Sequence, residues 1–296
     1  GVIPALSAVI KALTQPGDKV LIQTPVYNHF FTSIHNSGCQ AAESPLVYRD
    51  NTYTIDFDDL ERKAADPAVK LMLLCNPHNP AGRVWTPAEL HRIGELCLRH
   101  DVVVVADEIH CELVMPGFRY TPFASLCEEF ARRSVTCASP SKAFNLAGLQ
   151  VANIFAADAA LRARIGHSLQ INETGEIGPF AIEALIAAYD EGAEWLDALN
   201  EYLHGNYRFS REYFDRNLPQ YPVLPLEGTY LVWVDCRASG LTSDELETKL
   251  LEEAKLRINP GAIYGEAGRD FIRLNIACPR KLLAEGLDRL RKVLKR

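Results

Sequence analysis

One lysine in the chain has neighbours that suit covalent chemistry with an aldehyde. Lys142 ends the run S-P-S-K at residues 139–142, directly after residues 134–138, which predict a buried strand. An amine in this place can form a Schiff base with an aldehyde cofactor, and the hydroxyls of Ser139 and Ser141 can hold the cofactor's phosphate. Taken alone, a lysine after a strand is more often a solvated surface charge, and the two serines can simply form a turn.

Two other predicted strands also end in polar groups that packing does not require. Asp107 follows four valines and an alanine, and Asn79 lies in the run N-P-H-N-P-A-G that follows an apolar strand. Ligands of open α/β sheets bind beyond the carboxyl ends of the strands. A buried aspartate is costly unless it meets a cation or hydrogen-bond donors, and the protonated ring nitrogen of pyridoxal phosphate is such a cation. Asn79 can donate to the phenolic oxygen of that cofactor, which His110 can also approach.

Three further places complete this hypothesis. Tyr27 follows an earlier strand, where its ring can stack on the cofactor ring. Gly1, Val2 and Ile3 begin a helix, whose free backbone N–H groups and dipole suit a phosphate. Arg273 lies in an otherwise apolar strand, where its guanidinium suits bidentate capture of a substrate carboxylate.

Each of these residues also has an ordinary structural interpretation. Asp107 can cap a helix, Asn79 can hold its own turn, and His110 can be a satisfied core histidine. Tyr27 can be plain core and Arg273 half of a surface ion pair, while the first three residues can be an ordinary helix start. These interpretations are independent of one another, whereas one bound cofactor accounts for all of the residues together.

The elements that must position these residues alternate between strand and helix. Apolar strands are expected at residues 19–23, 38–42, 71–75, 102–106, 134–138 and 151–155. Helices are expected at the start of the chain and at residues 28–36, 56–65, 86–100, 158–169 and 179–189, with a hairpin at 48–55. Alternation of this kind, with strands that are apolar throughout, predicts an α/β fold with a mostly parallel sheet covered on both faces.

The last third of the chain has a different pattern. A long amphipathic helix is expected at residues 193–217, then strands at 229–234 and 271–276 and helices at 243–255 and 280–295. We therefore expect a large domain at residues 1–190 and a smaller α+β domain at residues 191–296.

Composition narrows the class of protein further. The chain has 296 residues, 48% of them hydrophobic and 23% charged, with a net charge of -7, which is typical of a soluble globular protein. It has no basic block, no apolar stretch of membrane-spanning length and no signal-peptide pattern, so we expect neither nucleic acid nor membrane as a partner. The eight scattered cysteines predict reduced thiols in a cytoplasmic protein, not a disulfide framework or a metal site. Because the chain starts at Gly1 directly in a helical pattern, we expect an earlier part to be absent.

Four motifs, in their order and spacing, resemble the pyridoxal-phosphate enzymes of aspartate aminotransferase fold, the class I and II aminotransferases. They lie at residues 76–82, 106–110, 139–142 and 273–276. Within that superfamily the sequence is most similar to the cystathionine β-lyases of the MalY/PatB kind. His110 stands where many aminotransferases have a tyrosine, and Gln150 stands where they have a phosphate-binding arginine. Both departures resemble the lyase branch.

The resemblance implies a role for each central residue. Lys142 would form the Schiff base, Asp107 would face the ring nitrogen, and Asn79 would face the phenolic oxygen. Tyr27 would stack on the ring, and Arg273 would bind the substrate carboxylate. The family also implies the fold type I architecture and a homodimer, for which the sequence offers an apolar helix face at residues 179–185. In this family the segment before residue 1 contributes to the small domain, the substrate pocket and a dimer contact.

The expected activity is a carbon–sulfur β-elimination. Cystathionine or a related S-substituted cysteine would be cleaved to a thiol, pyruvate and ammonia. Two alternatives stay open: an aminotransferase of class I or II that uses the same residues, and a regulatory or inactive protein on the same fold.

Overall fold

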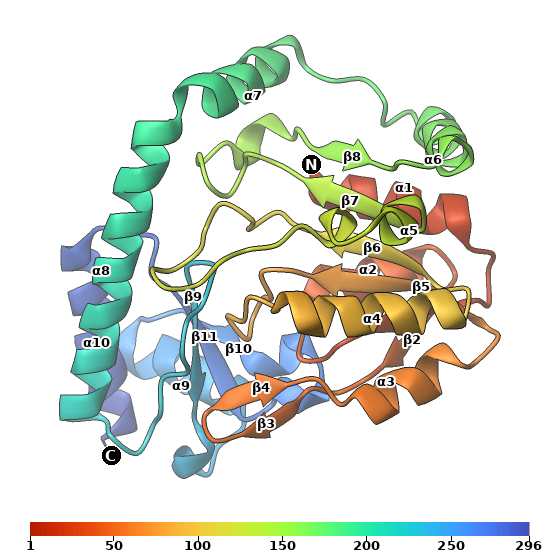
Figure 1. Cartoon of the computed structure of the whole chain (residues 1–296). Helices are drawn as coiled ribbons and strands as arrows, with labels where there is room; N and C mark the ends of the chain where they lie inside the picture. The colour runs from red at the N-terminus through yellow and green to blue at the C-terminus, as the bar shows by residue number, and fades with distance from the viewer. Residues whose placement is uncertain (296) are drawn as a thin grey trace.

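The computed structural model describes residues 1–295, whose centre is a six-stranded sheet in the order β2-β1-β5-β6-β7-β8 (Figure 1). The first five strands of that order pair in parallel, and β8 runs antiparallel to β7. The strands are β1 (Lys19–Ile22), β2 (Gln40–Glu43), β5 (Val69–Cys75), β6 (Val103–Asp107), β7 (Ser134–Ala138) and β8 (Asn153–Phe155). The prediction of an α/β fold with a mostly parallel sheet is confirmed.

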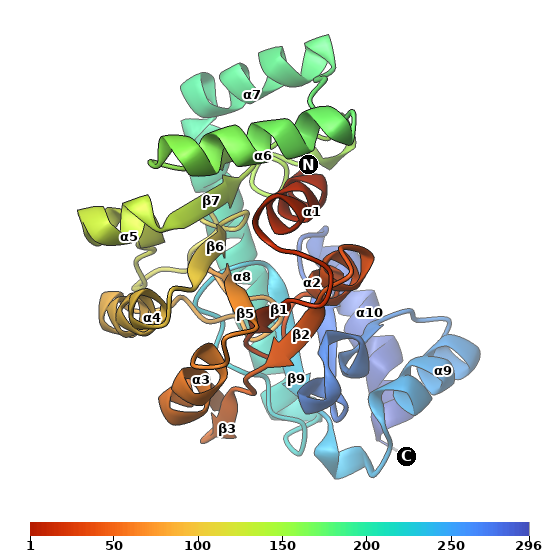
Figure 2. The ribbon, with the colours of Figure 1, turned by 90° about the vertical axis from the view of Figure 1, so that its right-hand side faces the viewer.

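Helices cover both faces of this sheet, as Figure 2 shows. On one face lie α1 (Val2–Leu13), α2 (Asn28–Asn36) and α6 (Ala159–Ile171), and on the other lie α3 (Phe57–Ala64), α4 (Pro87–Arg99) and α5 (Glu128–Arg132). Each face has its own apolar core, so the central strands are buried on both sides, and this is why they are apolar throughout.

Local sequence signals fix several of these elements. Thr86 and Glu89 form the expected capping box at the start of α4, with the Thr86 N–H donating to Glu89 Oε2 at 2.8 Å. The expected hairpin is present as β3 (Val47–Arg49) and β4 (Thr52–Thr54). Asp50 and Asn51 between them have φ values of 51° and 61°, which match the mirror-image turns that two-residue hairpins prefer.

The last third of the chain forms the smaller α+β unit. The long helix α8 (Ala193–Asn217) leads to a three-stranded antiparallel sheet in the order β10-β11-β9, which α9 and α10 accompany. These elements are β9 (Leu231–Asp235), β10 (Asn259–Pro260), β11 (Phe271–Asn275), α9 (Ser243–Ala254) and α10 (Arg280–Leu294). The sequence did not predict β10, because a strand of two residues has no periodicity. The exact domain boundary stays a prediction.

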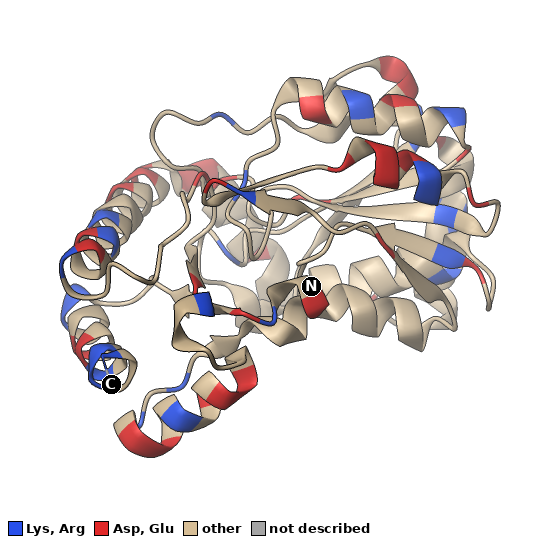
Figure 3. Cartoon of the chain, turned by 90° about the horizontal axis from the view of Figure 1, so that it is seen from below, with Lys and Arg blue, Asp and Glu red and all other residues tan. Residues whose placement is uncertain are grey.

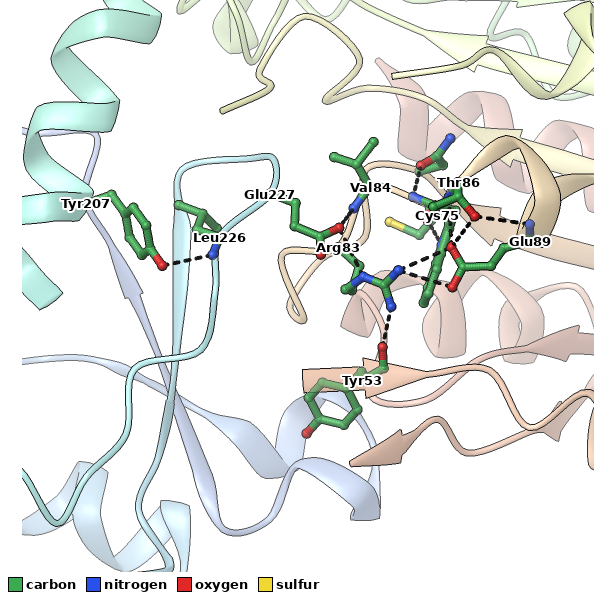
Figure 4. A network of polar contacts seen from close by, with 11 residues as sticks. Tyr53, Cys75, Arg83, Val84, Thr86, Glu89, Tyr207, Leu226 and Glu227 are labelled. Carbon is green, nitrogen blue, oxygen red and sulfur yellow. Dashed lines mark hydrogen bonds and ion pairs between the residues drawn. The ribbon is translucent and has the colours of Figure 1, made fainter. Parts of the chain in front are cut away.

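A partly buried ion-pair network joins the first unit to the second (Figure 4). Arg83 Nε contacts Glu227 Oε2 at 3.0 Å, and Arg83 Nη2 contacts Glu89 Oε1 at 3.1 Å. Glu227 also accepts from the backbone N–H of Val84 at 2.8 Å, while Tyr207 of α8 accepts from the N–H of Leu226 at 3.1 Å. Because the Arg83 carbonyl accepts from the N–H of His78 at 2.7 Å, the network braces the turn that carries Asn79.

The outer surface of the described residues is mixed in charge. In the view of Figure 3, acidic and basic residues are interspersed over most of the molecule, but α9 is mainly acidic and α10 is mainly basic. No helix within residues 1–295 is both long enough and apolar enough to cross a membrane. All eight cysteines are free, and five of them are buried.

Candidate active site

Three neighbouring strands bring the central polar residues to one edge of the sheet. Asp107 is the last residue of β6, while Asn79 and Lys142 lie in the loops that follow β5 and β7. Since β5, β6 and β7 are parallel neighbours, their carboxyl ends meet at this edge. The three side chains line one cavity of about 260 Å³.

Nearly all residues singled out in the sequence meet in this cavity. Those that line it are Gly1, Val2, Ile3, Tyr27, Asn79, Asp107, His110, Ser141, Lys142 and Arg273. They come from α1, the loops after four strands, and β11 of the second unit, so the cavity lies between the two units.

Ser139 lies differently from the prediction that both serine hydroxyls face a phosphate. Its side chain is buried outside the cavity lining. The Ser139 hydroxyl donates to the carbonyl of Val151 at 2.7 Å and accepts from the N–H of Ser141 at 3.2 Å. In this structure Ser139 therefore ties the lysine loop to the segment that leads into β8, while Ser141 lines the cavity.

Asp107 is a buried carboxylate whose charge is poorly compensated. It is 2% exposed, and its Oδ1 accepts one hydrogen bond, from the N–H of Ile109 at 3.2 Å. Burial raises the pKa of Asp107 to about 7, and the charge of Glu108 adds to this, while Lys142 opposes it. No helix follows Asp107 within the described residues before residue 123, so the helix-cap interpretation is wrong.

Lys142 lies in surroundings that favour its neutral form. Burial lowers the pKa of the Lys142 amine, the positive charge of Arg273 lowers it further, and Asp107 acts in the opposite direction. A neutral amine is both a nucleophile and a base, which an ordinary solvated lysine is not at neutral pH.

His110 is held neutral and has an unused polar atom. Burial, together with the charges of Lys142 and Arg273, lowers the pKa of His110 to about 3. Its Nδ1 is buried and has no hydrogen-bond partner among residues 1–295, and its ring meets Tyr230 edge-on at 5.7 Å between centroids. His110 is thus not a satisfied core histidine.

Arg273 is oriented by two amides and one aromatic ring. Its Nη1 donates to Asn79 Oδ1 at 2.9 Å, and its Nη2 donates to Asn259 Oδ1 at 3.1 Å. The guanidinium lies 4.8 Å from the centroid of the Tyr264 ring. Over the described part of the chain, no carboxylate forms an ion pair with Arg273 and its Nε has no partner, so the surface ion-pair interpretation is wrong.

Tyr27 and the start of α1 close other sides of the cavity. Tyr27 is half-buried at the start of α2, and burial, with the charge of Asp107, raises its pKa to about 12, so the phenol stays protonated. Gly1 precedes α1, whose first backbone N–H groups have no partner within the helix. Gln150 lies against Gly1, since a Cβ added to Gly1 would come within 2.9 Å of Gln150 Oε1.

Sequence reasoning missed the residues that support Arg273 and His110. Asn259 and Tyr264 precede Arg273 along the chain, and Tyr230 comes directly before β9, but the sequence assigned a role to none of them. A guanidinium in an apolar strand does require hydrogen-bond acceptors nearby, but the sequence does not indicate which residues supply them.

The donor set fits pyridoxal phosphate on observations of this structure alone. Within residues 1–295, Asp107 forms no ion pair, and a protonated ring nitrogen would supply a partner. His110 Nδ1 is an unsatisfied buried atom beside Lys142, and the N-terminus of α1 offers backbone donors for a phosphate at the same cavity. The polar groups that line the cavity are therefore compatible with bound pyridoxal phosphate.

Comparisons with known proteins agree with this geometry. A family model described as "Aminotransferase class I and II" matches residues 1–290. Cystathionine beta-lyase PatB of Bacillus subtilis strain 168 is 44% identical over 294 residues, covering 99% of this chain and 76% of PatB. Protein MalY of Escherichia coli K12 is 35% identical, covering 97% of this chain and 73% of MalY. The crystal structure of cystalysin from Treponema denticola, which contains a pyridoxal 5'-phosphate cofactor, has a TM-score of 0.97 at 38% identity, covering all of this chain and 75% of cystalysin.

Proposed function

The chain belongs to the class I and II aminotransferase family, and on this basis we propose that it is a pyridoxal-phosphate-dependent carbon–sulfur β-lyase. The substrate is cystathionine or a related S-substituted cysteine, and the products are a thiol, pyruvate and ammonia. The likeness to a cystathionine β-lyase, at 44% identity over 99% of the chain, carries this proposal. The cavity residues alone would serve an aminotransferase equally well, so that activity is the second candidate.

The cofactor would be held by residues on every side of the cavity. Asp107 would face the ring nitrogen, with Asn79 and His110 at the phenolic oxygen and Tyr27 against the ring. The backbone N–H groups at residues 1–3 and the hydroxyl of Ser141 would hold the phosphate. When bound, pyridoxal phosphate supplies an electron-withdrawing ring that stabilises negative charge on the α-carbon of the substrate.

The chain's own residues bind the substrate and move its proton. Arg273 binds the carboxylate, and the amides of Asn79 and Asn259 hold the plane of its guanidinium. Lys142, with its lowered pKa, takes the α-proton as a neutral amine. Asp107 keeps its negative charge once a cation faces it. Removal of the α-proton would allow the thiolate to leave the β-carbon, and Lys142 would return that proton to it; with one water, the S-substituted cysteine then gives a thiol, pyruvate and ammonia.

We also propose that the enzyme works as a homodimer in the cytoplasm. The exposed apolar side chains on α7 (Pro179–Glu191) support a second copy as partner: Phe180 is 80% exposed, and Ile182 and Ile186 are also exposed. Apolar patches of this kind mark interaction surfaces. The free cysteines support a reducing compartment.

The decisive test supplies L-cystathionine to the cofactor-loaded protein without any oxo acid and follows pyruvate and free thiol together. We expect the two products in equal amounts. Lys142→Ala should lower the rate by at least about 100-fold, because the base for the α-proton is lost. If pyruvate and thiol do not form, and an added 2-oxo acid is instead converted to its amino acid while the carbon–sulfur bond stays intact, the protein is an aminotransferase and the lyase proposal is wrong.

A further inference from the structure

His78 is a buried side chain that lies between two segments of the site but does not line the cavity. It directly precedes Asn79 in the turn after β5 and is 1% exposed. Its Nε2 lies 2.8 Å from the carbonyl oxygen of Pro25, in the segment of residues 24–27 that ends at Tyr27 and that we call the aromatic loop. His78 therefore joins the turn that carries one proposed cofactor ligand to the loop that carries another.

The hydrogen bond to the aromatic loop fixes the protonation of the His78 ring. A carbonyl oxygen only accepts, so Nε2 must carry the hydrogen. Burial lowers the pKa of His78 to about 4, although the contact with Pro25 opposes this, so the ring is neutral and has no second N–H. Its Nδ1 has no partner within residues 1–295, and the ring meets Trp85 edge-on at 5.3 Å between centroids. The single N–H of His78 is thus committed to the aromatic loop.

This hydrogen bond closes a ring of contacts around the cavity. On its other side the aromatic loop donates from the Val26 N–H to the carbonyl of Tyr264 at 2.9 Å. The Tyr264 ring lies 4.8 Å from the guanidinium of Arg273, whose Nη1 donates to Asn79 Oδ1 at 2.9 Å. Asn79 follows His78 in the chain, so the contacts return to their start. In the described part of the chain, no other hydrogen bond joins the aromatic loop to the Asn79 turn.

We infer that His78 is a positioning residue for the cofactor, and that its N–H sets the place of Tyr27 relative to Asn79. The inference rests on the proposed function only in that pyridoxal phosphate occupies the cavity, so it holds for a lyase and for an aminotransferase. Tyr27 would lie against the cofactor ring. Since Asn79 Oδ1 accepts from Arg273, the Asn79 Nδ2 is left to donate to the phenolic oxygen. Both residues therefore act on one rigid molecule, and a shift of the aromatic loop weakens the hydrogen bond at the phenolic oxygen.

The test removes the His78 N–H or supplies it from a different side chain. His78→Leu fills the space without a donor, whereas His78→Gln has an amide N–H at a similar reach. The two readouts are the dissociation constant of pyridoxal phosphate and the pH midpoint of the visible spectrum of the bound cofactor. His78→Leu should raise the dissociation constant about tenfold, which is the effect of one lost hydrogen bond.

His78→Leu should also raise the pH midpoint of the visible spectrum, by about 0.5–1 unit. A phenolic oxygen with a weaker hydrogen bond keeps more negative charge, so it holds the titrating proton of the cofactor more tightly. His78→Gln should restore most of both values, because its amide can donate to the Pro25 carbonyl.

The matched control is Tyr221→Phe, which removes another buried hydrogen bond from a side chain to the backbone. The Tyr221 hydroxyl donates to the carbonyl of Leu294 at 3.2 Å, in the second unit and outside the cavity lining. This variant should lower the urea midpoint of unfolding, as His78→Leu does, because each loses a buried hydrogen bond. It should leave the dissociation constant of the cofactor and the pH midpoint of its spectrum unchanged.

An unchanged dissociation constant and pH midpoint in His78→Leu would overturn the inference, and so would a His78→Gln variant that behaves like His78→Leu. If His78→Leu does not fold, His78→Asn replaces it, because its amide is a methylene shorter and does not reach the Pro25 carbonyl. Values equal to those of the unaltered protein would then overturn the inference. Neither readout uses turnover, so a protein that binds the cofactor but releases no thiol from L-cystathionine contradicts the proposed lyase alone.

Discussion

At the scale of a single residue, Asp107 destabilises the cofactor-free fold because its charge is buried. A carboxylate at the end of a buried strand is held with one backbone hydrogen bond, so its charge is unfavourable until a cation arrives. Its pKa of about 7 means that, without a cofactor, Asp107 stays protonated to near neutral pH. The cofactor-free site therefore already favours binding of a cation next to the Asp107 carboxylate.

Asp107→Asn should change how stability depends on pH in the cofactor-free protein. The folded pKa of Asp107 is raised, so its protonated form stabilises the fold below about pH 4, and that contribution is lost as the pH rises through 7. Asparagine has no charge to bury. Relative to the unaltered protein, the free energy of unfolding of the variant should therefore increase by a few kcal/mol between pH 4 and 8, at roughly 1.4 kcal/mol per pKa unit. Urea unfolding at several pH values measures this difference.

The control for this experiment is Asp215→Asn, which changes an exposed aspartate on α8. The difference in free energy of unfolding between this variant and the unaltered protein should not change over the same pH range. If the difference in free energy of unfolding between Asp107→Asn and the unaltered protein is also independent of pH, then the Asp107 carboxylate is not an uncompensated buried charge. With the cofactor added, the variant should instead be less stable than the unaltered protein at pH 8, because it has lost the partner of the ring nitrogen.

At the scale of elements, strand direction follows from whether the connection contains an α-helix that covers a face of the sheet. Strands β5, β6 and β7 are joined through helices or long loops, which allow the chain to return and pair in parallel. Between β7 and β8 the chain has only the lysine loop and a short 3₁₀ turn at Ala147–Leu149, and β8 runs antiparallel. This short return ties the lysine loop between two paired strands.

Helix α4 contains a glycine whose role is packing. A Cβ added to Gly94 would lie 2.5 Å from the ring of Phe130, which is buried and stacked on Phe123. Gly94→Ala should therefore destabilise the protein by about 1–3 kcal/mol, although alanine is the better helix former. Chemical denaturation measures the free energy of unfolding.

The matched control is Gly166→Ala in the middle of α6, where the added Cβ would have nothing within 4 Å. This variant should be stabilised by about 0.5–1 kcal/mol, since only the backbone entropy of glycine is removed. If both variants gain stability, the close contact between α4 and Phe130 does not constrain the fold.

At the scale of the whole molecule, the two units are joined by contacts at the cavity and by contacts outside it. Arg273 of β11 contacts Asn79 of the first unit, and the Arg83 network braces the same turn through the N–H of His78. Trp233 of β9 also donates to the hydroxyl of Tyr53 at 3.3 Å. A boundary near residue 190, which stays our proposal, would therefore separate two units that share one cavity.

Phe180→Glu tests the proposed dimer. A charge on this exposed side chain of α7 would be buried without a partner in an interface, so the dissociation constant should rise by about 100-fold or more. Sedimentation velocity over a range of concentrations measures this change.

The corresponding control is Leu282→Glu, which alters an exposed leucine of α10 in the second unit. Its dissociation constant should stay that of the unaltered protein. If Phe180→Glu also leaves association unchanged, then α7 is not the interface between two copies.

The sequence by itself determined the class of fold and most of the site. Apolar strands that alternate with capped helices predict a parallel sheet, and Asn79, Asp107 and Lys142 each follow such a strand. Because the carboxyl ends of parallel neighbours share one edge, these residues meet whatever the details of packing. The family followed from the same motifs, since their order along the chain is preserved.

Only the tertiary structure decided which groups lie around these residues. It showed that Ser139 bonds to Val151, and that Asn259 and Tyr264 hold Arg273. It also placed the start of α8 next to Lys142, where the two line one cavity. These contacts join residues of different elements, and a side chain's partner depends on packing that no local pattern encodes. Burial, which sets the pKa of Asp107, likewise arises only when the strands and helices pack together.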